Sequence, residues 1–494
     1  MNVGLSLGIV FGYLVLALAV GLIAYRVSGS TAEDYYLASR SIGTFVLLFT
    51  TFATLLSAFT FFGGPNLAYG AGPEWLIVMG TLDGVLFAVL WYVIGYKQWL
   101  IGARNGYMTL GEMLGDRFGS VGLRALVAGV SLLWLFPYVM LQQMGAGEAL
   151  VGLTGGAVPY WGGAALITGF MILYVTVAGL RGVAWTDTLQ GLFMLSVVWI
   201  AAAWVVSAVG GVGAATDAMV TARPEFGSFG GGTYTPGFII STAITIAFGV
   251  TMFPQINQRF FVAKSGTVLK RSFALWPVLV LLLFLPAFML GAWAAGMPIE
   301  VPDGANVLPV VLNEYAPAWF AALVIAGAIA AMMSSSDSML LSGSSYFTRD
   351  LYRPLIAADA SERREAWIAR IGVALFATLA FVASLFRPGT LIEVGGTAFS
   401  GFALLALPVL CALYWSRTTR TGMVVGVAVP QAAYLLVVLS SVLPLVPTLP
   451  RTVFGGWDVA LGLMALSALL TVGVSLLTAP TAEGDASRFA VASD

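Results

Sequence analysis

A run of small and hydroxyl residues with one acid, AAMMSSSDS, has the residue types and spacing to hold an ion. Four of its residues share the i, i+3, i+4 and i+7 spacing of one helix face: Ala331, Ser334, Ser335 and Ser338. Asp337 stands beside this face. Hydroxyl and carboxylate oxygens, without nitrogen or sulfur, are typical ligands of a hard cation, and sodium fits such a site. The alternative is structural, because small residues also let membrane helices pack closely.

Two other apolar segments look interrupted. The segment TTFATLLSAFT, from Thr50 to Thr60, is rich in small and hydroxyl residues and is soon followed by Gly-Gly-Pro. The segment FGVTMFP, which ends at Pro254, places a glycine and a proline inside an apolar run, and the proline removes a backbone hydrogen bond. Broken membrane helices free carbonyl groups, which secondary transporters use to hold ions and substrates. The pair of interruptions therefore favours a transporter.

Few other ionisable residues lie deep in apolar runs. Asp187, within AWTDT, is the second strong candidate besides Asp337, because an ionised side chain at mid-membrane costs about 2.5 to 3.5 kcal/mol. Asp187 and Asp337 could also form a carboxylate pair that shares one proton. We interpret Asp83 as hydrogen-bonded to a neighbouring helix, and Glu148 as lying near a helix end, where its carboxylate can reach the interface.

The composition indicates that these residues lie in a membrane protein. Of 494 residues, 59% are hydrophobic and 9% are charged, whereas about 25% are charged in an ordinary globular chain. The formal net charge of −1 argues against a nucleic-acid partner. The sequence has no histidine and one cysteine, Cys411, which excludes His-ligated metal sites, Ser-His-Asp triads, Cys-His dyads and disulfide frameworks. We therefore expect no enzymatic activity.

Thirteen apolar runs are long enough to cross a bilayer as helices, which takes about 20 residues. The first is interpreted as a retained helix rather than a signal peptide, because it lacks a basic n-region and a clear cleavage site. The interrupted runs are the second and the seventh, and this spacing predicts two five-helix repeats, spans 2–6 and 7–11. The runs are 4–24, 43–70, 75–98, 122–151, 158–179, 185–208, 237–262, 271–296, 310–347, 366–386, 392–414, 421–442 and 454–477.

Basic residues predict the orientation of these spans. With the N-terminus outside, 19 of the 22 lysines and arginines fall in cytoplasmic segments, and the other 3 are Arg223, Arg387 and Arg451. The C-terminus of this multi-pass protein is then on the cytoplasmic side of the cell (plasma) membrane. We expect residues 1–477 to form a single transmembrane transporter domain, and residues 478–494, which are small and polar, to form a disordered cytoplasmic tail.

The chain resembles the sodium:solute symporter family, which includes sodium/proline, pantothenate, monocarboxylate, sialic acid and sugar symporters. The order and span positions of several short motifs carry the resemblance. They are DYYL with RSIG within 34–43, TLGE with DRFG within 109–119, GLRGVAWTD at 179–187, PQI with RF within 254–260, AAMMSS with TRDLY within 330–352, and YW with an arginine within 414–417.

The resemblance implies an all-α membrane protein with the leucine-transporter-type fold, in which the two repeats are inverted. It also implies a sodium site made of main-chain carbonyls of the first broken helix and hydroxyls of the ninth span. The matching positions are the carbonyls of Ala53, Leu56 and Ala331 and the side chains of Ser334 and Ser335. Some members hold a further ion, for which the matching positions are Asp187, Asp337 and Ser338. Asp337 stands where a hydroxyl or amide is also common, so one or two coupled ions remain open.

The resemblance further implies a substrate site between both broken helices and the fourth span. The matching residues are Ser57, Ala58, Tyr138, Gln142, Ile246, Val250 and Pro254. Apolar Ile246 and Val250 depart from the aromatic residues of proline-type transporters, which disfavours proline as the substrate. Arg259 is expected near the inner end of its span. A carboxylate substrate would then rely on half-helix N-termini, hydroxyls and the bound cation.

These observations predict sodium-coupled symport of a small organic solute by alternating access, with a monocarboxylate or a pantothenate-like anion as the solute. Sodium is the only ion or cofactor expected, and the partners are the solute and the lipid bilayer, without nucleic acid or an obligate protein partner. Two alternatives stay open. One is a proton-coupled symporter of the same fold that uses Asp187 and Asp337. The other is a transporter-like sensor, although we find no domain beyond the membrane core.

Overall fold

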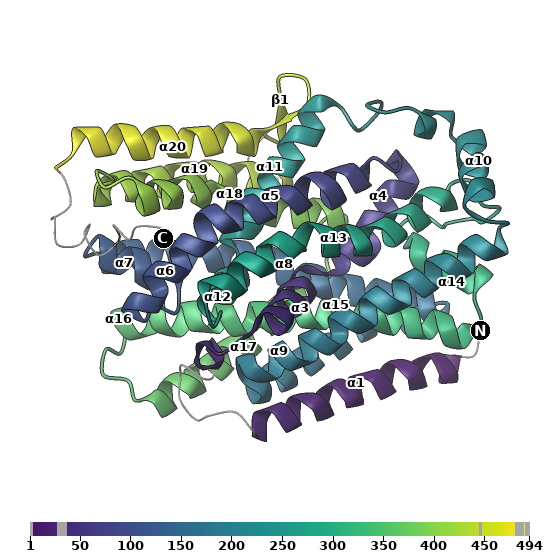
Figure 1. Ribbon diagram of the computed structural model, residues 1–494, viewed down its shortest axis with the longest axis horizontal. Helices are drawn as coiled ribbons and strands as arrows, with labels where there is room; N and C mark the ends of the chain where they lie inside the picture. Colours follow the sequence, from purple (N-terminus) through teal and green to yellow (C-terminus); the bar gives the residue numbers. More distant parts are fainter. Residues whose placement is uncertain (1–2, 27–36, 444–446, 480–488, 490–494) are drawn as a thin grey trace.

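The structure, a computed structural model, describes residues 3–26, 37–443, 447–479 and 489. Figure 1 shows long helices that run mostly along one axis, with a short hairpin in which Thr452 pairs with Asp458. The elements are α1 (Val3–Arg26), η1 (Ala38–Arg40), α3 (Thr44–Leu55), η2 (Phe59–Gly63), α4 (Gly64–Ala71), η3 (Ile77–Leu82), α5 (Asp83–Leu90), η4 (Trp91–Gly95), α6 (Tyr96–Asn105), α7 (Leu110–Arg117), α8 (Val121–Thr154), α9 (Tyr160–Ala208), α10 (Val212–Ala222), η5 (Pro224–Gly227), α11 (Pro236–Met252), α12 (Pro254–Phe261), α13 (Gly266–Ala294), α14 (Val307–Tyr315), α15 (Ala318–Ser345), η6 (Tyr346–Tyr352), α16 (Arg353–Leu355), α17 (Glu362–Ser384), α18 (Leu391–Tyr414), α19 (Arg420–Val442), β1 (Thr452–Val453), β2 (Trp457–Asp458) and α20 (Val459–Leu477).

Ten helices in the described ranges are long and apolar enough to cross a membrane, and twelve spans result if each of two bent pairs counts as one. The bent pairs are Thr44–Leu55 with Phe59–Ala71, at 63°, and Pro236–Met252 with Pro254–Phe261, at 56°. The predicted interruptions of spans two and seven are therefore present. A further apolar helix, Tyr160–Thr176, is shorter, so the count of thirteen stays a prediction.

The fifth and sixth predicted spans lie within one helix, α9, of 49 residues. Along a straight helix, Tyr174 and Thr186 would be about 18 Å apart, which is more than their side chains can bridge. Their hydroxyl oxygens nevertheless lie 2.6 Å from each other. The helix must therefore turn back between these residues, which supports two spans joined without a long loop.

The two breaks arise in different ways. Phe253 precedes Pro254, and a residue before proline disfavours helical backbone; Phe253 accordingly has φ −58° and ψ 133°. The first break contains no proline. There Leu56 is extended, with φ −78° and ψ 127°, and helical structure resumes at Phe59. Proline alone does not predict a break, because Pro137, Pro277, Pro286, Pro408 and Pro430 lie inside continuous helices.

The connecting helices divide between the two ends of the bundle. In Figure 1, α10 and α14 lie at the right with the start of α1, whereas α7 and α16 lie at the left. The helix α20 ends at the left, opposite the start of α1. The left end, with α7 and α16, is called the arginine-rich end below.

An ionic network joins the two halves of the bundle at the arginine-rich end. Glu112 on α7 accepts hydrogen bonds from Arg124 on α8, at 3.1 Å, and from Arg349 on η6, at 2.7 Å. Arg124 also pairs with the buried Asp350 at 2.8 Å. Thr109, whose side chain caps α7, donates to Asp350 at 3.0 Å. The network therefore fastens α7 to the segment that follows α15.

Candidate functional site

The first break faces the hydroxyl stripe of α15. The hydroxyl of Ser334 donates to the carbonyl oxygen of Ala53 at 2.7 Å. The hydroxyl of Ser335 donates to the carbonyl oxygen of Leu56. All four residues are buried. Carbonyls freed by the break therefore bond to serines from a distant part of the chain rather than to their own helix.

Two further carbonyls complete a cluster in which every atom that could bind a cation is an oxygen. Ala331 accepts from Ser334 at 3.0 Å, and Thr54 accepts from Ser335 at 2.9 Å. The structure thus brings together every residue that the sequence assigned to the sodium site, and adds the carbonyl of Thr54. Such donors suit a hard cation. The cluster also lies at the C-terminal end of α3, where helix carbonyls lack intrahelical partners and the helix dipole is negative.

The cluster between α3 and α15 differs in kind from a metal site built of acidic, histidine or cysteine side chains. No group of three or more such side chains that could hold a metal ion is found in the described part of the chain. The cluster instead offers main-chain carbonyls and hydroxyls.

Asp187 is paired with Arg259 inside the protein. Arg259 Nη2 lies 3.1 Å from Asp187 Oδ2, and each side chain is 1% exposed. The same nitrogen donates to the hydroxyls of Thr54, at 2.8 Å, and Ser338, at 2.5 Å. The hydroxyl of Thr50 donates to Asp187 at 2.6 Å. Arg259 does lie near the end of its span, two residues before the end of α12, but the bend of the seventh span turns α12 toward α3 and α15 and brings the guanidinium to Asp187.

The predicted second ion position is thus shared with a guanidinium. Arg259 engages Asp187 Oδ2 and the hydroxyl of Ser338. Asp187 Oδ1 and Asp337 Oδ1 are buried and have no hydrogen-bond partner within the described ranges. Both oxygens could therefore accept a cation or a proton. A second ion at Asp187, Asp337 and Ser338 stays a prediction.

The predicted substrate residues of the first break are joined to α8. The hydroxyls of Ser57 and Tyr138 lie 3.1 Å apart. The backbone N–H of Ala58 donates to Gln142 Oε1 at 3.0 Å. This N–H lies just before η2, at the start of the second half-helix, where helix N-termini favour anions. A carboxylate that reached this N–H would have to displace the Gln142 amide.

The predicted residues of the seventh span contribute apolar surface. Ile246, Val250 and Pro254 are all buried, on α11 and at the start of α12. Two aromatic rings that were not predicted lie beside Tyr138: the ring centroid of Phe253 is 5.1 Å away and that of Phe399 is 5.3 Å away. The sequence placed Phe253 in a break and Phe399 in the distant eleventh span, and neither position alone indicated this contact.

The polar residues of the second break behave differently from those of the first. Asn257 Nδ2 donates to the carbonyls of Phe253, at 2.8 Å, and Thr251, at 3.2 Å. The freed carbonyls of this break are therefore satisfied within the same span. Gln255 is 0% exposed, and both polar atoms of its side-chain amide lack a hydrogen-bond partner among the described residues. A buried unpaired amide costs about 1 to 3 kcal/mol, so a bound solute or water would stabilise it.

The two acids interpreted as structural have different surroundings. Glu148 accepts a hydrogen bond from Asn306 at 3.1 Å, and Asn306 in turn accepts from Asn66 at 2.7 Å. Glu148 thus ties α8 to the start of α14, which Asn306 also joins to α4. Asp83 is 1% exposed, and its carboxylate oxygens have no hydrogen-bond partner in the ranges that the structure covers. The expected bond from Asp83 to a neighbouring helix is therefore wrong.

Arg259, Thr50 and Thr54 are the polar residues of the site whose arrangement was not predicted. The two threonines are one helical turn apart in the hydroxyl-rich segment, so their hydroxyls lie on one helix face. This spacing could have suggested that both bind the same carboxylate. Arg259 follows a predicted break by five positions. Its approach to Asp187 depends on the direction of the bend, and no sequence pattern gives that direction.

Comparison with protein families gives one match over most of the chain. The model described as "Sodium:solute symporter family" matches residues 35–429. The sodium/pantothenate symporter of Escherichia coli (strain K12) is 28% identical over 449 residues, which cover 88% of this chain and 92% of that protein. The sodium/proline symporter of the same strain is 26% identical over 493 residues, which cover 94% and 93%.

Two solved structures share the fold. One is a Na+-coupled sialic acid symporter in a substrate-bound outward-open state, with a TM-score of 0.80 and 22% identity over 97% of this chain and 99% of that one. The other is a nucleobase-cation-symport-1 family transporter in a closed conformation, with a TM-score of 0.58 and 17% identity over 92% and 97%. These likenesses confirm the predicted fold class, an all-α membrane protein of the leucine-transporter type.

Proposed function

We propose that this chain, which belongs to the sodium:solute symporter family, carries a small organic solute into the cell together with sodium by alternating access. The family and the relatives support sodium-coupled symport by a multi-pass membrane protein, a transporter rather than an enzyme. The direction of transport, the solute and the residues that bind it are proposals that rest on the site.

The contact between α3 and α15 is the observation that supports the proposal. Ser334 and Ser335 of the second repeat bond to the carbonyls of Ala53 and Leu56 in the first repeat. A sodium ion bound by these atoms would hold the two repeats in one arrangement, and its departure would release them. Because a ligand shifts a conformational equilibrium by its differential affinity, this site would couple sodium to the movement that exposes the solute.

We infer a small carboxylate, either a monocarboxylate or a pantothenate-like anion, as the solute. The hydroxyls of Ser57 and Tyr138, the N–H of Ala58 and the amide of Gln142 offer hydrogen bonds to a polar end. Ile246, Val250 and Pro254 offer apolar surface to the rest of the molecule. Pantothenate symporters among the relatives support this class of solute.

The orientation and the single-domain organisation are also proposals. The segregation of 19 of 22 basic residues supports an N-terminus outside and a C-terminus in the cytoplasm of a plasma-membrane protein. Residues 1–477 would then be one transporter domain. The predicted tail, 478–494, lies mostly outside the described residues; Phe489 is described and stacks on Tyr107 with ring centroids 6.5 Å apart.

Uptake into proteoliposomes tests the function. Purified protein is supplied with radiolabelled short carboxylates, pantothenate, amino acids and sugars, with and without an inward sodium gradient. We expect one carboxylate to accumulate when the gradient is present. Accumulation of the same solute without any sodium would contradict sodium coupling, and empty liposomes provide the baseline.

Proton coupling is the second candidate, because Asp187 Oδ1 and Asp337 Oδ1 are buried without partners among the described residues. A pair of buried acids can share a proton. Uptake in sodium-free buffer across an inward pH step separates the two mechanisms: accumulation there supports proton coupling, and a requirement for sodium at every pH supports the first proposal.

A further inference from the structure

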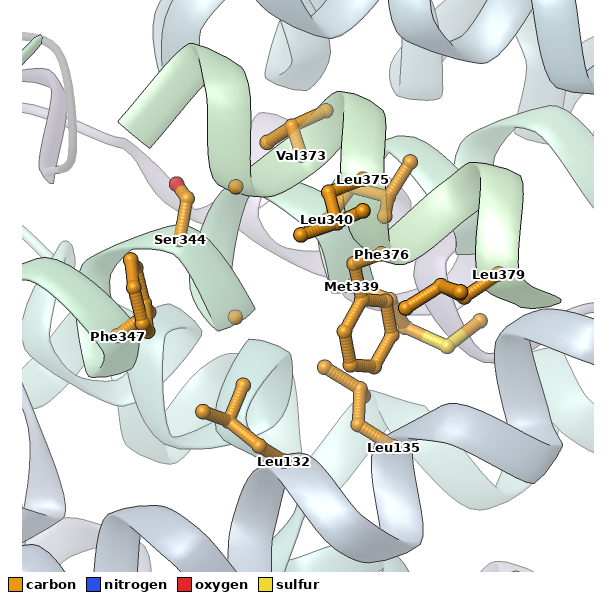
Figure 2. Close-up of a pocket in the computed structure, with 12 residues that line it drawn as sticks. Leu132, Leu135, Met339, Leu340, Ser344, Phe347, Val373, Leu375, Phe376 and Leu379 are labelled. Carbon is orange, nitrogen blue, oxygen red and sulfur yellow. The ribbon is translucent and has the colours of Figure 1, made fainter. Parts of the chain in front are cut away.

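An apolar cavity of about 150 Å³ lies between α8, α15 and α17 (Figure 2). Leucine, methionine, valine and phenylalanine side chains surround it, and the one oxygen visible among the labelled side chains belongs to Ser344. That hydroxyl already donates to the carbonyl of Leu341 at 2.7 Å. Water therefore has little to bond to, and apolar cavities of about this size stay dry and accept apolar molecules.

The cavity is open toward the bilayer rather than closed inside the protein. Leu375 and Leu379, which line it, are 59% and 51% exposed. Gly372 lines the cavity on α17, and a Cβ there would lie 3.4 Å from Phe347, in van der Waals contact. In a membrane, the apolar molecule present at such an opening is a lipid, so an acyl chain is the natural occupant.

Arginines lie at the arginine-rich end of the same groove. Arg364 is exposed, with its guanidinium 5.9 Å from the ring centroid of Tyr352. The Arg353 side chain is 39% exposed and lies 3.4 Å from Glu365, which also faces Arg349 at 3.7 Å. Because Arg349 is also paired with Glu112 at 2.7 Å, Glu365 is left mainly to Arg353, and Arg364 adds an exposed guanidinium. Exposed arginines at the membrane surface favour an anionic headgroup.

The distances along α17 match the depth of one leaflet. Gly372 and Leu379 follow Arg364 by 8 and 15 residues, or about 12 and 22 Å of helix. One leaflet is about 20 to 22 Å deep when its headgroup region is included, and about 15 Å of this depth is hydrocarbon. A lipid whose phosphate lies at the arginines would therefore place an acyl chain at the level of the cavity.

We propose that this groove is a specific site for an anionic phospholipid of the leaflet at the arginine-rich end, which is the cytoplasmic leaflet in the orientation proposed above. One acyl chain fills the cavity, and the phosphate pairs with Arg353 and Arg364. The lipid packs between α17 and the half of α15 that carries Met339, one turn beyond Ser335. It thereby supports the helix that supplies the serines of the sodium site.

Native mass spectrometry of delipidated full-length protein tests the site. Phosphatidylglycerol and phosphatidylcholine with identical acyl chains are titrated separately. The wild type should bind one phosphatidylglycerol more tightly than phosphatidylcholine. Arg353→Gln with Arg364→Gln should weaken phosphatidylglycerol about 30-fold, since each basic residue near an anionic surface contributes about fivefold. Gly372→Leu, which fills the cavity, should weaken both lipids.

Two matched controls separate the site from general lipid binding. Arg420→Gln removes an exposed arginine at the start of α19, and Gly129→Leu adds a side chain in open space on α8. Both should bind lipid as the wild type does. The proposal is overturned if the wild type binds both lipids equally, or if the double arginine variant keeps full affinity for phosphatidylglycerol. If Gly372→Leu is not monodisperse, the arginine variant alone decides.

Discussion

At the scale of single residues, Asp187 has two possible cationic partners, the guanidinium of Arg259 and a second ion. Arg259 uses one carboxylate oxygen and leaves the other buried without a partner among the described residues. The protein therefore holds a permanent internal cation beside the place predicted for an ion. An ion at the remaining oxygen of Asp187 would therefore share this carboxylate with the guanidinium of Arg259.

Asp187→Asn tests the second ion. If an ion binds at Asp187, Asp337 and Ser338, the substitution should lower the Hill coefficient for sodium in uptake toward one. Asp83→Asn, which changes a buried acid outside the site, should leave the coefficient unchanged. An equal coefficient in Asp187→Asn and the wild type would mean that this second position is absent. Uptake is normalised to folded protein, because Arg259 loses its buried partner in this variant.

Gln255→Leu tests whether the unpaired amide of the second break bonds the solute. The substitution removes no hydrogen bond that the structure shows, so the thermal unfolding temperature should not fall. The KM for the solute should rise about tenfold or more, as expected for a lost bond to a charged group. Asn257→Leu is the matched control, because it removes two observed bonds and should lower the unfolding temperature. An unchanged KM in Gln255→Leu would exclude contact with the solute.

At the scale of elements, the length of the apolar runs predicts the membrane spans, and helix-breaking residues predict the bends. The two bent spans follow from Pro254 and from the hydroxyl-rich segment, and the serine stripe follows from helical spacing. The turn within α9 falls between the predicted fifth and sixth spans, whereas the contact of Phe399 with Tyr138 was beyond this reasoning. That contact depends on how helices distant in sequence pack, and periodicity carries no information about that packing.

The contact between α7 and η6 belongs to this scale as well. Glu112 accepts hydrogen bonds from both Arg124 and Arg349, so Glu112→Gln should weaken the contact between α7 and η6 at the arginine-rich end. We expect amide hydrogen exchange in α7 and η6 to become about tenfold faster, with the transmembrane helices unchanged. Glu393→Gln is the control, because Glu393 belongs to the capping box of α18 and should affect only that helix start. Unaltered exchange in α7 would show that the network does not hold this end.

At the scale of the whole molecule, the energy source is sufficient for accumulation. At about 100 mV, one sodium ion gains roughly 2.3 kcal/mol from the membrane potential, which corresponds to about fiftyfold accumulation of a neutral solute. For a monovalent anion carried with one sodium, the charges cancel and the concentration gradient of sodium must supply the energy. The number of ions bound near Asp187 therefore decides whether the potential contributes to the uptake of a carboxylate.

The sodium dependence of uptake in two serine variants tests the central claim most directly. Ser335 bonds across the first break, whereas the neighbouring Ser336 is equally buried but donates to Met332 of its own helix. Ser335→Ala should raise the half-saturating sodium concentration about tenfold or more, because a ligand to a charged group is lost. Ser336→Ala should leave it near the wild-type value. Equal sodium dependence in Ser335→Ala and the wild type would contradict a sodium site between α3 and α15.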